Sequence, residues 1–381
     1  MKQELLNKYE TIFGIKAESY TRSGGRFELL GNHTDHNHGE TLASTCSLII
    51  EGAFGRQANN KVRLVSKGQC DFEISLDNTE CQEESVDKSA CFIRGIAHYL
   101  KLHGYKIGGF YAYTESMVHP GSGVSSSAAF EILLGKIFNQ LYNDNQIGIL
   151  DLCKAGQYAE NNYFGKKSGL LDQIACASMG ISYIDFENIE QPKIEILHNK
   201  FSDYQFVIVD TGRSHADLSD LYSSITSDMW NAAKKMGRQF LRECSEEKFE
   251  SIKSELTQGE YERSKHFFEE NKRVEKGRIC LKNGDIAGFL QCIRDSEHSS
   301  RTLLKNAMVN DEYDGSLAEA IDISNAAMDN VGASKINGGG FGGSIIAVVP
   351  KAKIDNYLKT MSSKYGLSHI FVVSILNEIM D

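Results

Sequence analysis

The stretch Gly24–Gly39 constrains this chain more than any other. Its sixteen residues hold one arginine, two acids, three histidines and four glycines. A turn between two secondary-structure elements needs far fewer polar side chains. A ligand site, a metal site or a turn specific to one fold would explain them. A structural explanation is equally open at this point. Phe27, Leu29 and Leu30 could form a half-buried strand, and the glycines and asparagines could supply turns.

Length and composition indicate a soluble protein of two or three domains. A chain of 381 residues is too long for one small core, and 41% of its residues are hydrophobic. The formal net charge of −10 argues against a general affinity for nucleic acid or anionic membranes. No apolar run reaches the roughly 18 residues that a membrane span needs, and the amino terminus lacks the apolar run of a secretory signal. We therefore expect a cytosolic protein, with its nine cysteines as reduced thiols.

Short strand and helix patterns alternate through both halves of the sequence, which predicts an α+β fold of two layered domains. Apolar spacing predicts a helix over residues 1–20, a helix over Ala90–Leu102 and a buried strand over Tyr204–Asp210. We expect the domain boundary between residues 195 and 203. The predicted domains are therefore 1–198 and 199–381.

The loop Pro120–Ser127 is the first candidate for chemistry. Its small residues let backbone N–H groups approach an anion, and the helix predicted from Ser125 onward turns its positive end toward the same place. It is not a Walker A loop, and Gly121 with Gly123 lacks the third glycine of a dinucleotide fingerprint. The segment predicts a phosphate site, and a serine-rich helix cap remains the alternative.

Asp172 and Glu160 form the second candidate. An acid in an apolar neighbourhood, as Asp172 is, could accept a proton, and Glu160 could help to hold a divalent cation. Each could instead be a helix cap or a solvated charge, and their spacing does not decide between these alternatives.

The third candidate is Gly338–Gly343, five glycines around Phe341 just before a predicted strand. Such a run permits close backbone approach or positive φ angles, although a tight turn would need no more. The histidines near residue 35 match no standard zinc spacing, so a metal site there is disfavoured.

Together these segments resemble the GHMP small-molecule kinases and, within them, the galactokinase family. Residues 25–35 are similar to the galactokinase signature G-R-x-N-L-I-G-E-H-x-D-Y, and residues 120–129 to the phosphate loop P-x-G-x-G-L-S-S-S-A. Residues 169–173 are similar to the family's G-I-M-D-Q, and residues 336–343 to its third, glycine-rich motif. Three motifs in the right order cover the chain from about residue 10 to its end.

The resemblance implies the two-domain GHMP fold, with an N-terminal ribosomal-protein-S5-like domain and a C-terminal ferredoxin-like domain. It also implies a sugar 1-kinase that uses ATP and Mg²⁺. Asp172 would face the anomeric hydroxyl as base or orienting carboxylate, and Arg26 would stabilise its ionised form and the developing phosphoryl charge. The extent to which Asp172 removes the proton before phosphoryl transfer stays open, because a loose transition state needs little activation of the nucleophile.

Ligand contacts are implied residue by residue. Sugar contacts are expected at Asn32, His33, Asp35, Gly169 and Tyr222. Phosphate and ATP contacts are expected at Gly121, Gly123, Ser125, Ser126, Ser127 and Gly340. Ser126 and Glu160 would bind the metal ion.

The chain differs from the galactokinase pattern at Asn32, His36 and Gly24, among other positions. Asn32 stands where the family has a glutamate that helps to bind the sugar near its C6 hydroxyl, His36 replaces a tyrosine, and Gly24 replaces a proline. An amide does not repel a negative group. The resemblance makes galactose the first expected substrate. Because Asn32 would not repel a carboxylate at C6, galacturonate or another sugar is the alternative. A non-catalytic sensor of sugar and ATP is less favoured, because the phosphate loop and Asp172 are both present.

Overall fold

The computed structural model describes residues 2–81, 87–118, 123–166, 168–213 and 218–376. It consists of two compact units that are discontinuous in sequence. Unit 1 comprises Met1–Arg26, Cys46–Pro120 and Ser125–Ser178, and unit 2 comprises Phe27–Thr45, Gly121–Val124 and Met179–Asp381. These units do not coincide with the predicted domains 1–198 and 199–381, which stay a prediction.

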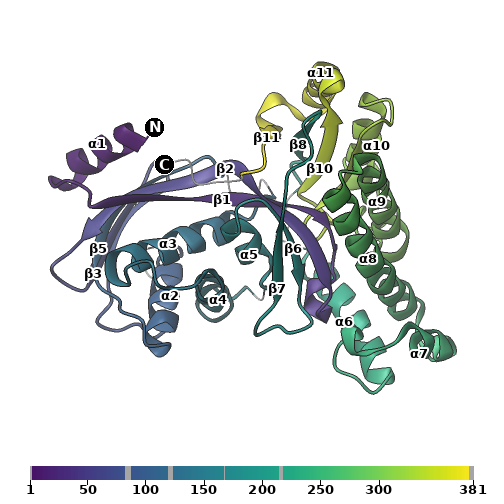
Figure 1. Cartoon of the computed structure of the whole chain (residues 1–381), viewed down its shortest axis with the longest axis horizontal. Coiled ribbons are helices and arrows are strands. Elements are labelled where there is room, and N and C mark those ends of the chain that lie inside the picture. The colour runs from purple at the N-terminus through teal and green to yellow at the C-terminus, as the bar shows by residue number, and fades with distance from the viewer. Residues whose placement is uncertain (1, 82–86, 119–122, 167, 214–217, 377–381) are drawn as a thin grey trace. The chain divides into compact units, whose positions relative to one another are not determined.

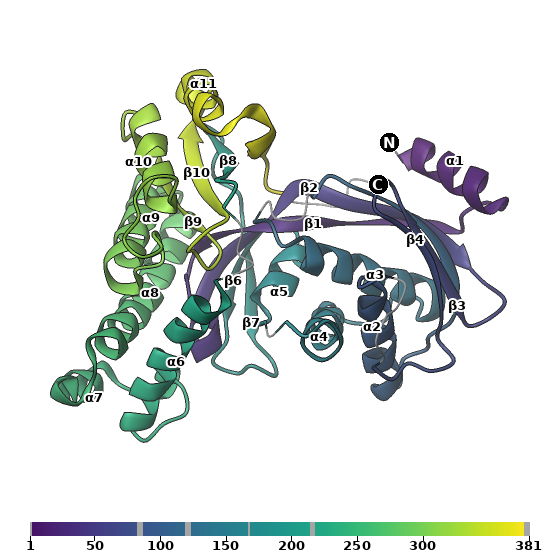
Figure 2. The same cartoon turned by 180° about the vertical axis from the view of Figure 1, so that it is seen from behind.

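Unit 1 is a sheet with helices on both faces. Its strands include β3 (Lys61–Ser66), β4 (Cys70–Ser75), β5 (Phe110–Ser116) and parts of β1 (Ser19–Leu30) and β2 (Glu40–Arg56). The order is β4-β3-β5-β2, with β3 parallel to β5 and β2 antiparallel to β5. Figures 1 and 2 show α2–α5 along one face and α1 on the other. These helices are α1 (Lys2–Phe13), α2 (Ala90–Leu102), α3 (Ser126–Tyr142), α4 (Ile149–Ala159) and α5 (Leu171–Ala177).

The first helix is shorter than the sequence predicts. A helix over residues 1–20 is wrong beyond Phe13, because Gly14 takes up a left-handed conformation with φ 72° and β1 starts at Ser19. A glycine in this conformation is a common helix end. Leu5 and Tyr9 of α1 pack on Ala53 and Tyr113 of the sheet.

Unit 2 contains an antiparallel four-stranded sheet of order β11-β8-β10-β9. Its strands are β8 (Tyr204–Asp210), β9 (Ala333–Asn337), β10 (Ser344–Pro350) and β11 (Ile370–Val373). A second antiparallel ladder joins the start of β2 to β6 (Ile181–Asp185) and β7 (Lys193–Leu197). The helices are α6 (Ser219–Lys235), α7 (Glu246–Ser251), α8 (Gln258–Asn283), α9 (Ile286–Ser299), α10 (Leu317–Ala327) and α11 (Ile354–Tyr365).

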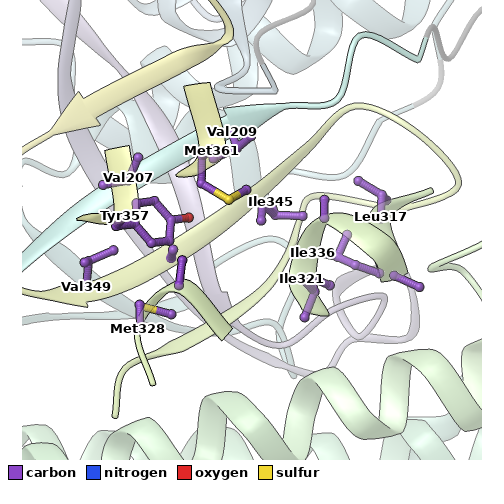
Figure 3. Packing of buried hydrophobic residues seen from close by; sticks show 14 of the residues in the cluster. Val207, Val209, Leu317, Ile321, Met328, Ile336, Ile345, Val349, Tyr357 and Met361 are labelled. Carbon is purple, nitrogen blue, oxygen red and sulfur yellow. The ribbon is translucent and has the colours of Figure 1, made fainter. Parts of the chain in front are cut away.

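The core of the four-stranded sheet lies between its strands and the helices α10 and α11. Figure 3 shows Val207 and Ile345 from the strands together with Ile321, Tyr357 and Met361. All five are at most 1% exposed. Burial of one large apolar side chain contributes about 1.5–3 kcal/mol, so this cluster fixes the sheet that carries β9 and the glycine run after it.

The local sequence sets several helix ends. Thr257 and Glu260 form a capping box at the start of α8, and Gly284 ends that helix with a positive φ of 73°. Among the residues described above, none of the helices is long and apolar enough to cross a membrane.

Candidate active site

Arg26 and Asp172 form an ion pair within unit 1. Arg26 lies on β1, and Asp172 lies in the first turn of α5. Arg26 Nε is 2.7 Å from Asp172 Oδ1, and Arg26 Nη2 is 3.1 Å from Oδ2. The guanidinium therefore binds both carboxylate oxygens. The Asp172 side chain is 25% exposed, compared with 9% for Arg26, so the carboxylate is oriented and still accessible.

The surroundings of Asp172 keep its carboxylate ionised. Burial by itself would raise the pKa of Asp172, but the charge and hydrogen bonds of Arg26, the charge of Lys166 and the hydroxyl of Ser125 together hold this pKa below its ordinary value. At neutral pH the group is therefore an acceptor, as orientation or deprotonation of a substrate hydroxyl requires.

The start of α3 brings two serine hydroxyls to these acids. Ser125 precedes the helix in a left-handed conformation with φ 55°, and its hydroxyl donates to Asp172 Oδ2. Ser127 donates to Glu160 Oε1 over 3.0 Å. The sequence predicted Ser126 beside Glu160, whereas the hydroxyl that contacts Glu160 belongs to Ser127. The N-terminal end of α3 carries the positive end of the helix dipole, which favours an anion.

Glu160 is buried in a polar cluster at the start of a π-helical turn, Glu160–Phe164. Its Oε1 lies 2.8 Å from Lys166 Nζ, and its Oε2 accepts from Ser168 Oγ at 2.5 Å and from Gln173 Nε2 at 3.2 Å. Gln173 also donates to Glu131, whose pKa is raised well above its usual range by burial and by the charge of Glu160. The two carboxylates therefore share one amide donor, Gln173 Nε2.

This cluster offers oxygen donors for a hard cation. Among the described ranges, no group of three or more His, Cys, Asp and Glu side chains could hold a metal ion. Glu160 with the hydroxyls of Ser127 and Ser168 is a sparse set of oxygens. Mg²⁺ commonly uses one or two carboxylates and takes its other ligands from water and substrate phosphates. The donor set therefore fits Mg²⁺ bound together with phosphate.

Asn32 lies in unit 2, in the turn after β1, and is fully buried. Its Nδ2 donates to Glu28 Oε1 over 3.1 Å and to the Gly338 carbonyl over 2.6 Å. Its Oδ1 accepts from Asn306 Nδ2 at 2.9 Å. Both amide hydrogens are thus used within the protein, although the sequence predicted a sugar contact for this residue.

Three side chains predicted to contact sugar hold consecutive carbonyl groups of the glycine run. Asn32 binds the carbonyl of Gly338. His33 Nε2 lies 2.8 Å from the Gly339 oxygen, and the Tyr222 hydroxyl lies 2.8 Å from the Gly340 oxygen. Asn306 also donates to the Gly339 oxygen over 2.9 Å. Gly340 has φ 93°, and a Cβ atom there would lie 2.5 Å from the backbone oxygen of Asn306, so only glycine fits.

The tautomers of His33 and His36 follow from their partners. Asn37 Oδ1 accepts from the backbone N–H of Leu241 over 3.2 Å, so its Nδ2 is the donor that reaches His36 Nδ1 at 2.9 Å. His36 therefore carries its proton on Nε2 and donates to His33 Nδ1 over 3.4 Å. His33 in turn carries its proton on Nε2 and donates to the Gly339 carbonyl. Both rings are neutral, because burial lowers the pKa of His33 and lowers that of His36 to about 3.

Because His266 is buried, we expect the free energy of unfolding to fall in mild acid. His266 is fully buried, donates to the Asn32 carbonyl over 2.8 Å and accepts from Ser299. Burial lowers its pKa to about 4 despite the opposing charge of Glu270. As the pH falls below about 6.5, His266 therefore binds a proton in the unfolded chain before it does so in the folded protein, which favours unfolding. His266 alone should lower the free energy of unfolding by about 2 kcal/mol at pH 5.

Urea denaturation of the wild type and of His266→Gln at pH 7.5, 6 and 5 measures this effect. Glutamine keeps a donor and an acceptor but does not titrate. The dependence of unfolding free energy on pH should be weaker in the variant, and equal slopes in the two proteins would contradict the prediction.

The remaining predicted residues are placed as follows. Gly121 lies outside the described residues. Gly123 has φ 74° and accepts from Asn337 Nδ2 over 2.9 Å, and a Cβ atom there would lie 1.9 Å from Ser344 Oγ. Gly169 is exposed just before α5, and Asp35 begins the 3₁₀ turn Asp35–Asn37. Their ligand roles stay predictions.

Several residues of these clusters were not predicted from the sequence. Glu28 and the fully buried Lys335 pair over 2.8 Å although they are 307 residues apart. A lysine next to an apolar strand and a glycine run is the one signal that could have pointed to this pair. The others are Glu131, Lys166, Ser168, His266 and Asn306.

Two segments of the chain match known protein families. Residues 91–180 match the GHMP kinases N terminal domain, and residues 7–56 match the galactokinase galactose-binding signature. The galactokinase of Lactobacillus helveticus is 30% identical over 375 residues, which cover 96% of this chain and 94% of that relative. A galactokinase of Streptococcus thermophilus is 29% identical over 95% of this chain and 93% of its own length.

Solved structures share the fold. The Lactococcus lactis galactokinase complexed with galactose superposes with a TM-score of 0.84 at 24% identity, over 99% of this chain and 98% of that one. The mevalonate kinase of Methanococcus jannaschii gives a TM-score of 0.67 at 16% identity, over 94% and 98% of the two chains. The α+β fold expected from the resemblance is confirmed.

Proposed function

Because the chain belongs to the galactokinase family of the GHMP kinases, we propose that it transfers the γ-phosphoryl group of ATP to the anomeric hydroxyl of galactose. The observation that carries the proposal is the ionised, partly exposed Asp172, which is held by Arg26 and touched by the hydroxyl of Ser125. The products are galactose 1-phosphate and ADP. The cytosolic location and the lack of nucleic-acid partners stay predictions.

In the proposed reaction Asp172 accepts a hydrogen bond from the anomeric hydroxyl and takes its proton. The new bond forms between that oxygen and the γ-phosphorus, while the bond from the γ-phosphorus to the bridging oxygen breaks and ADP leaves with the electron pair. Arg26 keeps Asp172 ionised and offsets the charge that develops on the phosphoryl group. Asp172 mainly orients the hydroxyl if the transition state is loose.

The phosphates are assigned to backbone and hydroxyl donors. Ser125, Ser126 and Ser127 surround the N-terminal end of α3, and we assign ATP contacts to them together with the backbone of Gly121, Gly123 and Gly340. Mg²⁺, held by Glu160 and Ser127, would neutralise phosphate charge. Sugar contacts are assigned to His33, Asp35, Gly169 and Tyr222, whereas both amide hydrogens of Asn32 are already bound within the protein.

A sugar 1-kinase of galacturonate is the second candidate. The observation in its favour is the neutral amide at position 32, since the nearby carboxylate of Glu28 is already paired with Lys335. Position 32 therefore carries no uncompensated negative charge that would repel a carboxylate on the sugar.

A panel of sugars with ATP and Mg²⁺ decides between the two. We expect ADP release with galactose and a product phosphorylated at C1, as read by NMR of the anomeric proton. Galacturonate, glucose and arabinose serve as comparison sugars. If galacturonate is phosphorylated and galactose is not, the second proposal replaces the first. If none of the sugars on the panel leads to ADP release, both proposals are rejected.

A further inference from the structure

Asn32 stands at the centre of a buried network in unit 2. Glu28 is 4% exposed, and Asn32 and Lys335 are not exposed at all. Lys335 Nζ lies 2.8 Å from Glu28 Oε1 and 2.9 Å from the Ile336 carbonyl. The same Glu28 oxygen accepts from Asn32 Nδ2. The network therefore links β1, the turn after it and the end of β9.

The ion pair fixes which way the Asn32 amide points. Glu28, paired with a lysine, is an acceptor, and so is the carbonyl of Gly338. Rotating the amide by half a turn would place its oxygen against these two acceptors and its NH₂ against the NH₂ of Asn306. The observed orientation is thus the one in which every partner of Asn32 is of the opposite kind.

This orientation matters for the glycine run. Glycines have the largest conformational freedom of any residue, so a run of them needs external contacts to hold one conformation. The Gly338 carbonyl is held by Asn32, and the next two carbonyls by His33, Asn306 and Tyr222. In a planar trans peptide the N–H points away from the preceding carbonyl, so fixing the carbonyls also fixes the N–H groups of Gly339 and Gly340.

We propose that Asn32 is a positioning residue, oriented by the buried Glu28–Lys335 pair, that fixes the glycine run for ligand binding. The signature quoted above has an amide at position 28 and a carboxylate at position 32, so this chain carries the two groups in reverse order. The carboxylate at position 28 binds Lys335, and the amide at position 32 has no hydrogen left for a sugar. The inference rests on the proposed function, because it assigns the glycine run to the kinase site.

Two double variants separate orientation from charge. Glu28→Gln with Lys335→Met, called the glutamine double variant, removes both charges but leaves a side-chain oxygen that accepts from Asn32. Glu28→Leu with Lys335→Met, called the leucine double variant, removes the same charges and also the acceptor. Neither double variant buries an unpaired charge, but the leucine double variant leaves one N–H of Asn32 without its acceptor, so we expect its melting temperature to be the lower of the two. The two proteins differ in what holds the amide of Asn32.

We expect the glutamine double variant to keep kcat/KM for galactose within about threefold of the wild type, and the leucine double variant to lose at least about tenfold. Equal kcat/KM in two folded double variants would overturn the proposal, because a merely structural pair would affect both alike. If the leucine double variant does not fold, Asn32→Ala in the wild-type background gives the same test. A folded Asn32→Ala with wild-type kcat/KM would overturn the proposal as well.

Binding of ATP separates this inference from the proposed function. Gly340 is assigned to ATP, so the Kd for ATP measured by calorimetry should be at least about tenfold higher in the leucine double variant than in the glutamine double variant. That measurement needs no turnover. A wild type that phosphorylates no sugar rejects the proposed function alone, whereas equal Kd values for ATP in the two double variants reject the positioning role.

Discussion

Asp172→Asn is expected to lower kcat with galactose at least about 10³-fold, because the amide cannot take a proton and presents an NH₂ group where an acceptor is needed. The amide would also place donors against the Arg26 guanidinium and the Ser125 hydroxyl, which both donate to this side chain in the wild type. Steady-state kinetics with galactose and ATP measures the loss. Because Asp172 is not assigned to nucleotide contacts, the Kd for ATP should change less than about threefold.

Asp151→Asn is the matched control. Asp151 belongs to the same unit, lies on α4, and accepts from the Tyr105 hydroxyl over 2.6 Å. The same chemical change there should leave kcat unaltered. If Asp172→Asn is folded and turns over at the wild-type rate, Asp172 is not a catalytic residue. If kcat falls equally in both variants, the loss reflects a general effect on the unit.

The secondary structure could be predicted best where a pattern was long and bounded by clear signals. The helix Ala90–Leu102 and the strand Tyr204–Asp210 have the bounds expected from their apolar spacing. The helix over residues 1–20 was overextended, because polar residues after Gly14 fit the end of a helix as well as the start of a strand. The strand β7, Lys193–Leu197, was missed although its polar and apolar residues alternate, because it is short and overlaps the predicted domain boundary.

The local parts of the site were visible in the sequence, but its long-range pairs were not. The motifs identified Arg26, Asp172 and Ser125, which the structure brings into contact within unit 1. The pair of Glu28 and Lys335 could not be deduced, because nothing in a single sequence indicates which residue 307 positions away meets a buried acid. For the same reason the hydrogen bonds of Asn32 to Gly338 and Asn306 could not be deduced, and its sugar contact stays a prediction.

Arg26→Met is expected to lower kcat/KM about 10²–10³-fold, the cost typical of removing one preorganised donor that stabilises transition-state charge. The variant also removes the charge and the two hydrogen bonds that oppose the effect of burial on Asp172. The pKa of Asp172 should therefore rise, and the fraction of ionised Asp172 should fall at mildly acidic pH. The acidic limb of the kcat/KM profile should move to higher pH.

Arg26→Lys is the control for this change, since it keeps the positive charge and loses only the paired geometry of the guanidinium. We expect its acidic limb to lie between those of the wild type and Arg26→Met, with a smaller loss of kcat/KM. Both profiles are measured from about pH 4.5 to 8.5, the range in which a shifted carboxylate would titrate. If kcat/KM falls in Arg26→Met while the acidic limb stays where it is in the wild type, Arg26 acts on the phosphoryl group and not through the ionisation of Asp172. If neither quantity changes, Arg26 contributes nothing to the reaction, and its pairing with Asp172 only stabilises the fold.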